Sequence, residues 1–337
     1  MLSRCSDYIP LFTKDEYIEN REPHKQWRWK HKSCGHEFKS EYLNGFIVRC
    51  CPKCYDIHTV TSKQENEVVD FIRSIYKGTI FHRKYENRHL IPNTKEIDII
   101  LPELKLCIEY DGLYFHSSKF RTNNFHVHKT KECEKLGYRL IHIFEDEWIH
   151  QRKIVKNKLK HIIRKDHPRI FAKNCEVSTI DDTTKNAFMT KYHILGADHS
   201  KIRYCLKYRG RVVAMATIIK SRFSKAHQWE LSRYATISNF VIVGGFGKLL
   251  SHFEREHKPC SIVAYSDKRW SNGDMFMKLG FRLIKATRPS KFYVYHSRRL
   301  GRLIERNVDI SKDKLSKLHV IYDCGNLVFE KRFTRDH

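Results

Sequence analysis

Acidic residues are scarce in this sequence. The 337-residue chain has 38 aspartates and glutamates against 64 lysines and arginines, giving a formal net charge of +26 and an isoelectric point near 9.6. A charge of this sign attracts polyanions, nucleic acids above all. Binding to ribosomes or to membrane surfaces would account for the same excess. The charge therefore indicates a class of partner but no reaction.

Long apolar runs, low-complexity tracts and clear internal repeats are also absent. No stretch is apolar over the length of a membrane-spanning helix, and residues 1–10 contain Arg4 and Asp7, so we expect neither a membrane span nor a signal peptide. The 11 cysteines are odd in number and scattered, which argues against a disulfide framework and fits a reducing compartment. We expect a cytoplasmic protein of two or three domains.

Three acids interrupt an apolar hairpin between residues 96 and 116. Two short apolar strands flank a turn at Pro102, and they carry Asp98, Glu109 and Asp111. Because side chains alternate faces along a strand, Glu109 and Asp111 should point the same way, with Asp98 joining them across the hairpin. Crowded carboxylates need a cation, and oxygen ligands suit Mg²⁺, the usual ion for work on phosphates. An exposed acidic hairpin is the alternative, but the flanking residues are too apolar for it.

A second metal site is predicted between residues 27 and 54. Cys51 and Cys54 form a CxxC turn whose thiolates can bind one ion, and His31 and Cys34 stand at the same spacing upstream. These four residues make a tetrahedral zinc set that leaves no position for a substrate. We therefore expect a structural zinc.

The segment around this site resembles the treble-clef or zinc-ribbon modules of phage and bacterial nucleases. Those modules mostly have cysteine at the position of His31, and imidazole also binds zinc well. His36 and Cys50 are rival ligands. The basic side chains of the module that we expect to contact DNA are Arg28, Lys30 and Lys32.

A helix with apolar residues at helical spacing is predicted from Ser62 onward. Ser62 and Glu65 have the spacing of a capping box, so Glu65 could serve only to cap this helix. Glu65 could equally face the metal, and both roles stay open. A second helix is expected to end at Gly137, before a buried strand at 140–144 and a basic helix. This order suits an α/β nuclease core.

Residues 60–160 resemble the PD-(D/E)xK superfamily, and within it the very-short-patch repair and EDxHD homing endonucleases that phages encode. The strings IEYDGLYFHSS and KTKECEKLGYRLIHIFEDEW carry the resemblance. It implies that Asp98 is the primary metal ligand, that Asp111 stands where the repair enzymes have a catalytic histidine, and that His116 matches their second histidine. Lys129 stands where those enzymes have an acid. The lysine of the (D/E)xK triplet is missing, because aspartate occupies its position.

The resemblance implies hydrolysis of a DNA phosphodiester. Asp98, with Glu109 or Asp111, would hold Mg²⁺ and lower the pKa of a bound water. His116 would act as general base, or as acid to the leaving oxygen. Lys129 would stabilise the charge of the transition state. A half-buried structural His116 and a solvated Lys129 are the alternatives. The number of metals and the identity of the base stay open.

A new domain is predicted from about residue 173. Strands are expected at 202–207, 212–219, 229–235 and 261–266, with a glycine-rich turn at 244–247 and a helix at 248–256. This order, closed by the string FMKLGF, resembles the GNAT acyltransferase fold, whose glycine-rich turn binds pyrophosphate on backbone amides. The arginine or glutamine that usually precedes the turn is absent, with Ile242 or Val243 in its place. The resemblance implies acetyl-CoA as a cofactor. The alternatives are that the glycine-rich turn only starts a helix and binds no ligand, or that the domain contacts DNA.

Basic residues with interleaved aromatics follow, a pattern that fits a surface tracking phosphates. The members of this cluster that we expect to contact DNA are Arg288, Lys291, Arg298, Arg299 and Arg302. A solvated basic tail is the alternative.

Together these patterns predict an α/β multidomain protein. Residues 1–57 would form an N-terminal arm and zinc module, 58–166 a restriction-endonuclease-like core, 173–300 a GNAT-like α+β domain and 301–337 a basic extension. We expect a Mg²⁺-dependent, site-specific homing-type endonuclease that binds double-stranded DNA and no membrane. The alternatives are a GNAT-type acyltransferase acting on nucleic acid or protein, with the nuclease-like domain binding DNA, and a non-catalytic DNA-binding protein. Oligomeric state and recognition site stay open.

Overall fold

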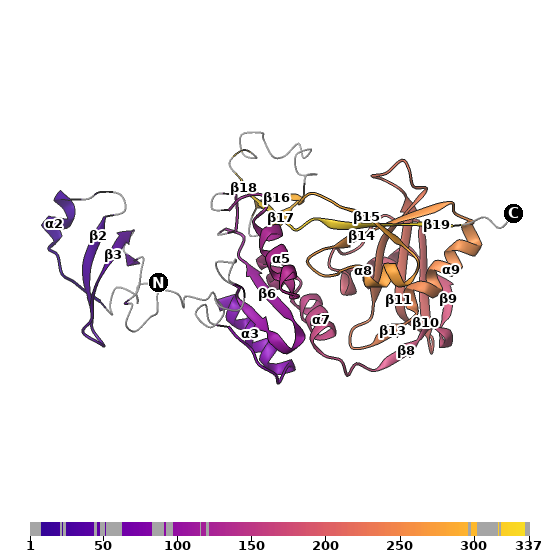
Figure 1. Cartoon of the computed structure of the whole chain (residues 1–337), viewed down its shortest axis with the longest axis horizontal. Helices are drawn as coiled ribbons and strands as arrows, with labels where there is room; N and C mark the ends of the chain where they lie inside the picture. The colour runs from indigo at the N-terminus through magenta and orange to yellow at the C-terminus, as the bar shows by residue number, and fades with distance from the viewer. Residues whose placement is uncertain are drawn as a thin grey trace.

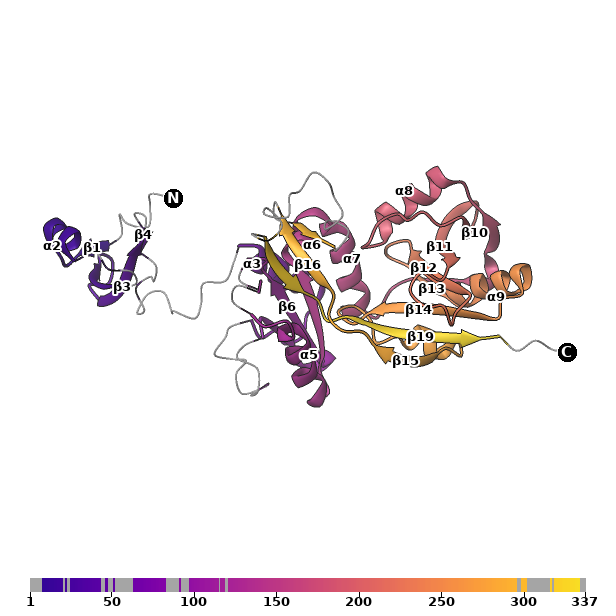
Figure 2. The same cartoon turned by 90° about the horizontal axis from the view of Figure 1, so that it is seen from above.

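The structure is a computed structural model. The residues it describes are 8–20, 22, 25–43, 46–47, 51, 63–82, 91, 97–114, 116–118, 121–295, 298–301, 316 and 318–333. In two perpendicular views, a central α/β unit and a larger C-terminal sheet lie side by side (Figures 1 and 2). No helix among the described residues has the length and apolar character needed to cross a membrane.

The N-terminal module is a small sheet with the strand order β1-β2-β3-β4. Its elements are β1 (Tyr8–Pro10), α2 (Lys14–Glu19), β2 (Gln26–His31), β3 (Glu37–Leu43) and β4 (Phe46–Ile47). Thr13 and Glu16 cap the start of α2 reciprocally, which satisfies two backbone N–H groups that a helix end leaves free. Alternation along β2 buries Trp27 and Trp29 in an aromatic core, and it turns Arg28 outward.

The central unit is a three-stranded sheet in the order β5-β6-β7, covered by helices. Its elements are α3 (Lys63–Ile75), β5 (Ile99–Leu101), η1 (Pro102–Leu104), β6 (Leu106–Asp111), α5 (Phe125–Lys135), β7 (Arg139–Phe144), α6 (Glu145–His150) and α7 (Arg152–Ile163). β5 and β6 form the expected antiparallel hairpin, and Lys105 closes it with φ 48°. β6 and β7 are parallel, which requires the crossover through α5.

The two faces of β6 have different partners. Ile108 and Tyr110 pack with Val69 of α3 and Val155 of α7 in one core cluster. Each fully buried aliphatic side chain there contributes roughly 1.5–3 kcal/mol. Glu109, which lies between Ile108 and Tyr110, occupies the opposite face of the strand, toward α5. The alternation of side chains along β6 therefore determines which of them contact α5.

The C-terminal half contains a seven-stranded sheet with the order β15-β19-β14-β12-β11-β10-β9. Its strands are β9 (Glu176–Thr179), β10 (Ile202–Tyr208), β11 (Arg211–Lys220), β12 (Trp229–Thr236), β14 (Ser261–Asp267), β15 (Arg282–Ala286) and β19 (Asn326–Arg332). The accompanying helices are η2 (Ala172–Asn174), α8 (Asp182–Tyr192), α9 (Gly245–His257) and α10 (Asp274–Lys278). Neighbouring strands are antiparallel except β12 and β14, which are parallel. The chain thus has a mixed α/β structure.

The sheet extends beyond the boundary expected at residue 300. β19, within the segment assigned to a basic extension, pairs with both β14 and β15. Val328 and Phe329 are buried in it, so this strand supplies core rather than a solvated tail. The sequence pattern did not reveal this because β19 has no local partner in the chain.

An insertion between β15 and β19 reaches the central unit. It contains β16 (Lys291–Tyr295), β17 (Arg298–Leu300) and β18 (His319–Tyr322), which form a sheet in the order β17-β16-β18. Ile321 packs against Leu113 and Phe144 in one buried cluster. The insertion therefore joins the two halves through apolar contacts.

Outside this insertion, β8 (Arg169–Phe171) pairs in parallel with β13 (Val241–Val243).

Buried ion pairs cross the same interface. Arg269 Nη1 lies 2.9 Å from Glu147 Oε1, and Arg299 Nη2 lies 2.7 Å from the same oxygen. Arg299 also pairs with Asp146 at 2.9 Å. We expected Arg299 to contact DNA, but its buried guanidinium instead neutralises acids at the start of α6.

Candidate functional site

α5 lies over the polar face of β6 and matches it residue by residue. His126 and Lys129 are three residues apart and buried, so they project from the same side of the helix. Lys129 meets Glu109, and His126 meets Asp111, which is two residues further along the strand. The expectation that Glu109 and Asp111 share a face agrees with these contacts.

The first group of charges consists of Asp98, Glu109 and Lys129. Lys129 Nζ donates to Glu109 Oε2 at 2.6 Å. The backbone N–H of Asp98 donates to Glu109 Oε1 at 3.2 Å, and Asp98 Oδ2 accepts from the Tyr110 N–H at 2.8 Å. These contacts lock the acids of the hairpin to one another and to α5.

Burial controls the titration of this group. Burial, with the charge of Glu65 next, raises the pKa of Asp98 to about 7. Burial and the charge of Asp98 raise the pKa of Glu109 well above its usual value. Burial alone would lower the Lys129 pKa, but Glu109 and Asp98 raise it. Lys129 therefore acts here as the counter-charge of the acids and is not a solvated helix residue.

The second group surrounds Asp111, whose side chain is completely buried. Asp111 Oδ1 lies 2.9 Å from His116 Nδ1 and 3.3 Å from His126 Nε2. Its other oxygen, Oδ2, lies 2.9 Å from His142 Nδ1 on β7. Burial raises the Asp111 pKa, but the charges of His126, His142 and His116 outweigh it and lower the pKa well below its usual value.

A further shell fixes these histidines. His126 Nδ1 lies 2.7 Å from the Tyr322 backbone carbonyl, on the insertion of the C-terminal half. His142 Nε2 lies 3.0 Å from the Thr130 hydroxyl of α5. Burial lowers the pKa of His142 to about 4.

The expected magnesium set is divided between these groups. Among the described residues, Asp98, Glu109 and Asp111 do not form a cluster whose ligand atoms all lie within 4.8 Å, whereas Asp111, His116 and His126 do. Glu65 lies beside the first group, with its Oε1 3.2 Å from His82 Nε2. His126 was not among the residues expected at the site. Its position one turn before Lys129 was the signal that could have revealed it.

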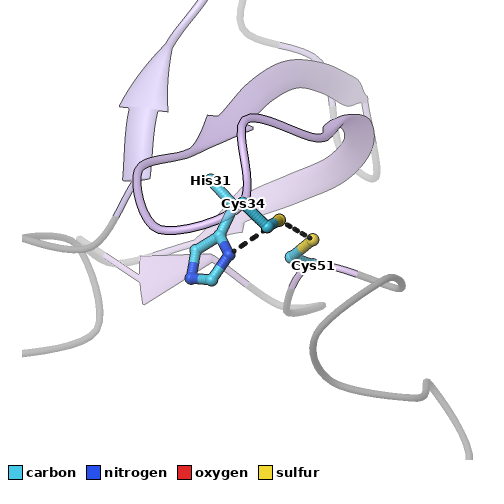
Figure 3. A group of neighbouring side chains, drawn as sticks. All are labelled: His31, Cys34 and Cys51. Atoms are coloured by element: carbon cyan, nitrogen blue, oxygen red, sulfur yellow. Dashed lines mark hydrogen bonds between the residues drawn. The ribbon is translucent and has the colours of Figure 1, made fainter.

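The structure brings together three of the four expected zinc ligands (Figure 3). His31 Nδ1 lies 3.2 Å from Cys34 Sγ, and Cys34 Sγ lies 3.6 Å from Cys51 Sγ. Gly35, at φ 67°, allows the tight turn after Cys34. Cys54 lies outside the described residues, as does the rival Cys50.

The basic residues expected at DNA occupy different environments. Arg28 is exposed and pairs with Glu37 at 2.9 Å, Lys30 is half-buried and Lys32 is exposed. Arg288 and Arg298 are exposed, Lys291 lies over the Tyr293 ring, and Arg302 lies outside the described residues.

A cavity opens where the only parallel pair of the seven-stranded sheet separates. β12 and β14 pair only from Trp229 to Leu231 on the β12 side, and the strands part beyond Leu231. A cavity of about 820 Å³ lies there, lined by residues of both strands and of the segment before β16. Its charged and hydroxyl-bearing lining residues include Arg222, Glu230, Ser232, Arg233, Asp267 and Arg288.

The glycine-rich turn lies at the N-terminus of α9. Gly244 is exposed at φ 72° and precedes the first helical residue. Gly245 and Gly247 allow close packing, because an added Cβ would lie 2.6 Å from the Tyr234 hydroxyl or 3.0 Å from Leu279 respectively. Ile242 is buried, so no side-chain donor occupies the position before the turn.

Comparisons with known proteins find likeness over about half of the chain. An IAA acetyltransferase from Bacillus cereus is 14% identical and covers 47% of this chain and 99% of its own, with a TM-score of 0.28. A GNAT family acetyltransferase from Elizabethkingia anophelis with acetyl-CoA bound is 16% identical, covers 48% and 99%, and has a TM-score of 0.29. The ribosomal-protein-S18-alanine N-acetyltransferase of Escherichia coli is 10% identical, covers 48% and 96%, and has a TM-score of 0.30. No family model and no curated protein matches the chain.

These findings correct the expected activity. The matching solved structures are acetyltransferases, which are transferases, so the prediction that the chain is a DNA endonuclease and hydrolase is wrong. The divided acids agree with this correction, since the carboxylates that were to share one Mg²⁺ are separately neutralised by Lys129 and by histidines.

His193, on the wall of the cavity, gives a pH prediction. Burial, followed by the charges of Arg233 and Lys158, lowers its pKa to about 3, and its Nδ1 accepts a hydrogen bond from the Leu195 N–H. The unfolded chain takes up this proton near pH 6.5 and the folded chain does not. Stability should therefore fall between pH 7 and pH 4, by up to about 3 kcal/mol from this residue.

The measurement is urea unfolding of the wild type and of His193→Asn at pH 7 and pH 4. The wild type should lose more stability than the variant on acidification. The exposed His199→Asn serves as the matched control and should follow the wild type. Equal losses in the wild type and His193→Asn would contradict the assignment.

Proposed function

We propose that this chain is a GNAT-type acyltransferase that binds double-stranded DNA and acylates an acceptor on nucleic acid or on a protein bound to it. The observation that carries the proposal is the cavity between β12 and β14. It is the point where two parallel strands part, and the chain continues from β12 through β13 to the glycine-rich turn and α9. Crevices at the carboxyl ends of parallel strands are favoured ligand sites, since their backbone groups and loops are free to contact a ligand.

The residues present fit acetyl-CoA in two respects. The parted strands offer a slot for the extended arm of the coenzyme, and the exposed Gly244 opens the amide-bearing end of a 13-residue helix to phosphate oxygens. The absent side-chain donor at Ile242 predicts weaker binding than a complete turn would give. When bound, this group would supply an activated acyl thioester.

The acceptor side of the cavity is basic. Arg222 and Arg288 are exposed at its wall, and Glu230 holds Arg222 at 2.5 Å. These guanidinium groups suit an anionic acceptor, oriented by its phosphates with its amine directed into the cavity. Leu231 and Phe276 line the cavity with apolar side chains, which would limit the access of water to a bound thioester.

Acetyl-CoA binding tests this proposal directly. Gly244→Asp introduces a carboxylate where phosphates would lie, and its Cβ would have room, with Ala172 Cβ 3.8 Å away. In isothermal titration calorimetry with acetyl-CoA, we expect micromolar to millimolar binding by the wild type. Gly244→Asp should weaken it at least about tenfold, a loss of roughly 1.4 kcal/mol.

The matched control for this experiment is Gly210→Asp. Gly210 is also an exposed glycine at positive φ with open space around it, in the β10–β11 hairpin. It should bind acetyl-CoA like the wild type. No heat from the wild type at millimolar acetyl-CoA, or equal weakening by both variants, would reject the proposed coenzyme site.

DNA binding rests on the charge of the chain and on exposed cations near the cavity. Arg288→Glu should weaken binding of a duplex several-fold at low salt and reduce the slope of log Kd against log salt by about one. Fluorescence anisotropy over a salt series measures both quantities. Arg255→Glu, at an exposed position near the end of α9, carries the same change of charge away from the cavity. Equal effects of the two variants would indicate only a general charge effect.

We also propose that the N-terminal module holds a structural zinc on His31, Cys34 and Cys51, with Cys54 as fourth ligand. The distances among the first three ligand atoms support it. Substituted Co²⁺ should give a thiolate charge-transfer band in the near ultraviolet. Cys51→Ser should remove or strongly reduce this band and loosen the packing of Trp27 and Trp29.

The control for the zinc site is Cys260→Ser, because Cys260 is exposed in the C-terminal half. This variant should keep the band. A wild-type chain that binds Co²⁺ without any thiolate band would rule out the zinc assignment.

A further inference from the structure

We propose that Asp111, His116 and His126 hold one divalent transition-metal ion, at a site separate from the zinc module and from the cavity between β12 and β14. The site is built by the end of β6, by the segment after it and by α5. Its ligand class differs from the all-oxygen magnesium set expected from the sequence.

Three ligand atoms converge on one point. Asp111 Oδ1 lies 2.9 Å from His116 Nδ1 and 3.3 Å from His126 Nε2, and the two nitrogens lie 3.2 Å apart. Tetrahedral ligands bound at 2.0–2.2 Å are separated by about 3.3–3.6 Å. The triangle is therefore close to the size that a bound ion requires.

The hydrogen bonds around the triangle leave one N–H group for two acceptors. His126 Nδ1 donates to the Tyr322 carbonyl at 2.7 Å, so Nε2 of an uncharged ring is an acceptor, 3.2 Å from His116 Nδ1 and 3.3 Å from Asp111 Oδ1. Asp111 Oδ1 is buried and, despite its short distances, has no hydrogen-bond partner of acceptable geometry. A metal ion bound between these atoms would satisfy Asp111, His116 and His126 together.

The donor set selects the class of ion. Two imidazole nitrogens and one carboxylate oxygen suit Zn²⁺, Mn²⁺, Fe²⁺ or Co²⁺ better than Mg²⁺, which prefers oxygen ligands. Three protein ligands leave at least one position open. The His116 side chain, 16% exposed, is the ligand that solvent reaches, so the open position should take water or a small anion there.

The outer shell comes from both halves of the chain. Metal-bound histidines usually donate their second N–H to a carbonyl, which fixes the tautomer, and Tyr322 of β18 supplies that carbonyl. His142 lies at 2.9 Å from Asp111 Oδ2 and fixes the carboxylate. The site is thus complete only when the insertion of the C-terminal half is docked.

Cobalt titration of the metal-free full-length chain tests the site. We expect Co²⁺ uptake with weak visible d–d absorption and no thiolate charge transfer, in addition to the thiolate band of any zinc-module cobalt. His116→Asn, which changes the most accessible ligand, should weaken this uptake at least about tenfold, and His126→Asn should do the same. Circular dichroism checks that each variant is folded.

His128→Asn is the matched control, because His128 is an exposed histidine two residues after His126 on the same helix. It should bind Co²⁺ like the wild type. Two results would overturn the proposal. One is a wild type whose cobalt uptake gives only the thiolate-containing spectrum of the zinc module. The other is a folded His116→Asn variant that keeps the additional d–d absorption without thiolate charge transfer. Because acetyl-CoA binding is read separately by calorimetry, failure of this site and failure of the proposed acyltransferase remain distinguishable.

Discussion

Burial of two carboxylates on one face of β6 is the constraint on which the rest of the structure depends. Glu109 and Asp111 are 1% and 0% exposed, and an uncompensated buried charge costs several kcal/mol. The compensation comes from α5, through Lys129 at 2.6 Å from Glu109 and His126 at 3.3 Å from Asp111. The buried face of α5 is polar for this reason, and the helix is held in register by charges as well as by apolar contacts.

The same constraint ties the C-terminal half to the centre. His126 needs an acceptor for its second ring nitrogen, and the carbonyl of Tyr322 provides it from an insertion almost two hundred residues away in sequence. Glu147, buried at the same interface, is neutralised by Arg269 and Arg299. Removing either half would leave buried polar groups without partners. The central unit and the seven-stranded sheet are therefore expected to fold as a coupled pair.

The sequence allowed local features to be predicted but not their long-range partners. Alternation along β6 correctly placed Glu109 and Asp111 on one face, and ligand spacing placed His31 and Cys34 together. Period and spacing are local, so they are readable without a structure. Arg299 could not be assigned in this way, because its acidic partners lie more than 150 residues away. The expectation that three neighbouring acids share one ion missed their pairing with Lys129, His116 and His142 for the same reason, because these partners come from other segments of the chain.

A continuous series of contacts joins the proposed metal site to the cavity. The His126 ring packs against Phe144 with centroids 5.5 Å apart, and the guanidinium of Arg269 lies 4.9 Å from the centre of the Phe144 ring. Arg269 in turn holds Asp267, which lines the cavity. Contact alone does not establish coupling, which requires two arrangements of these residues that both ligands affect differently. If metal binding changes acetyl-CoA affinity by some factor, linkage requires acetyl-CoA to change metal affinity by the same factor. Both affinities are measurable on one protein, so the two sites can be shown to be coupled or independent.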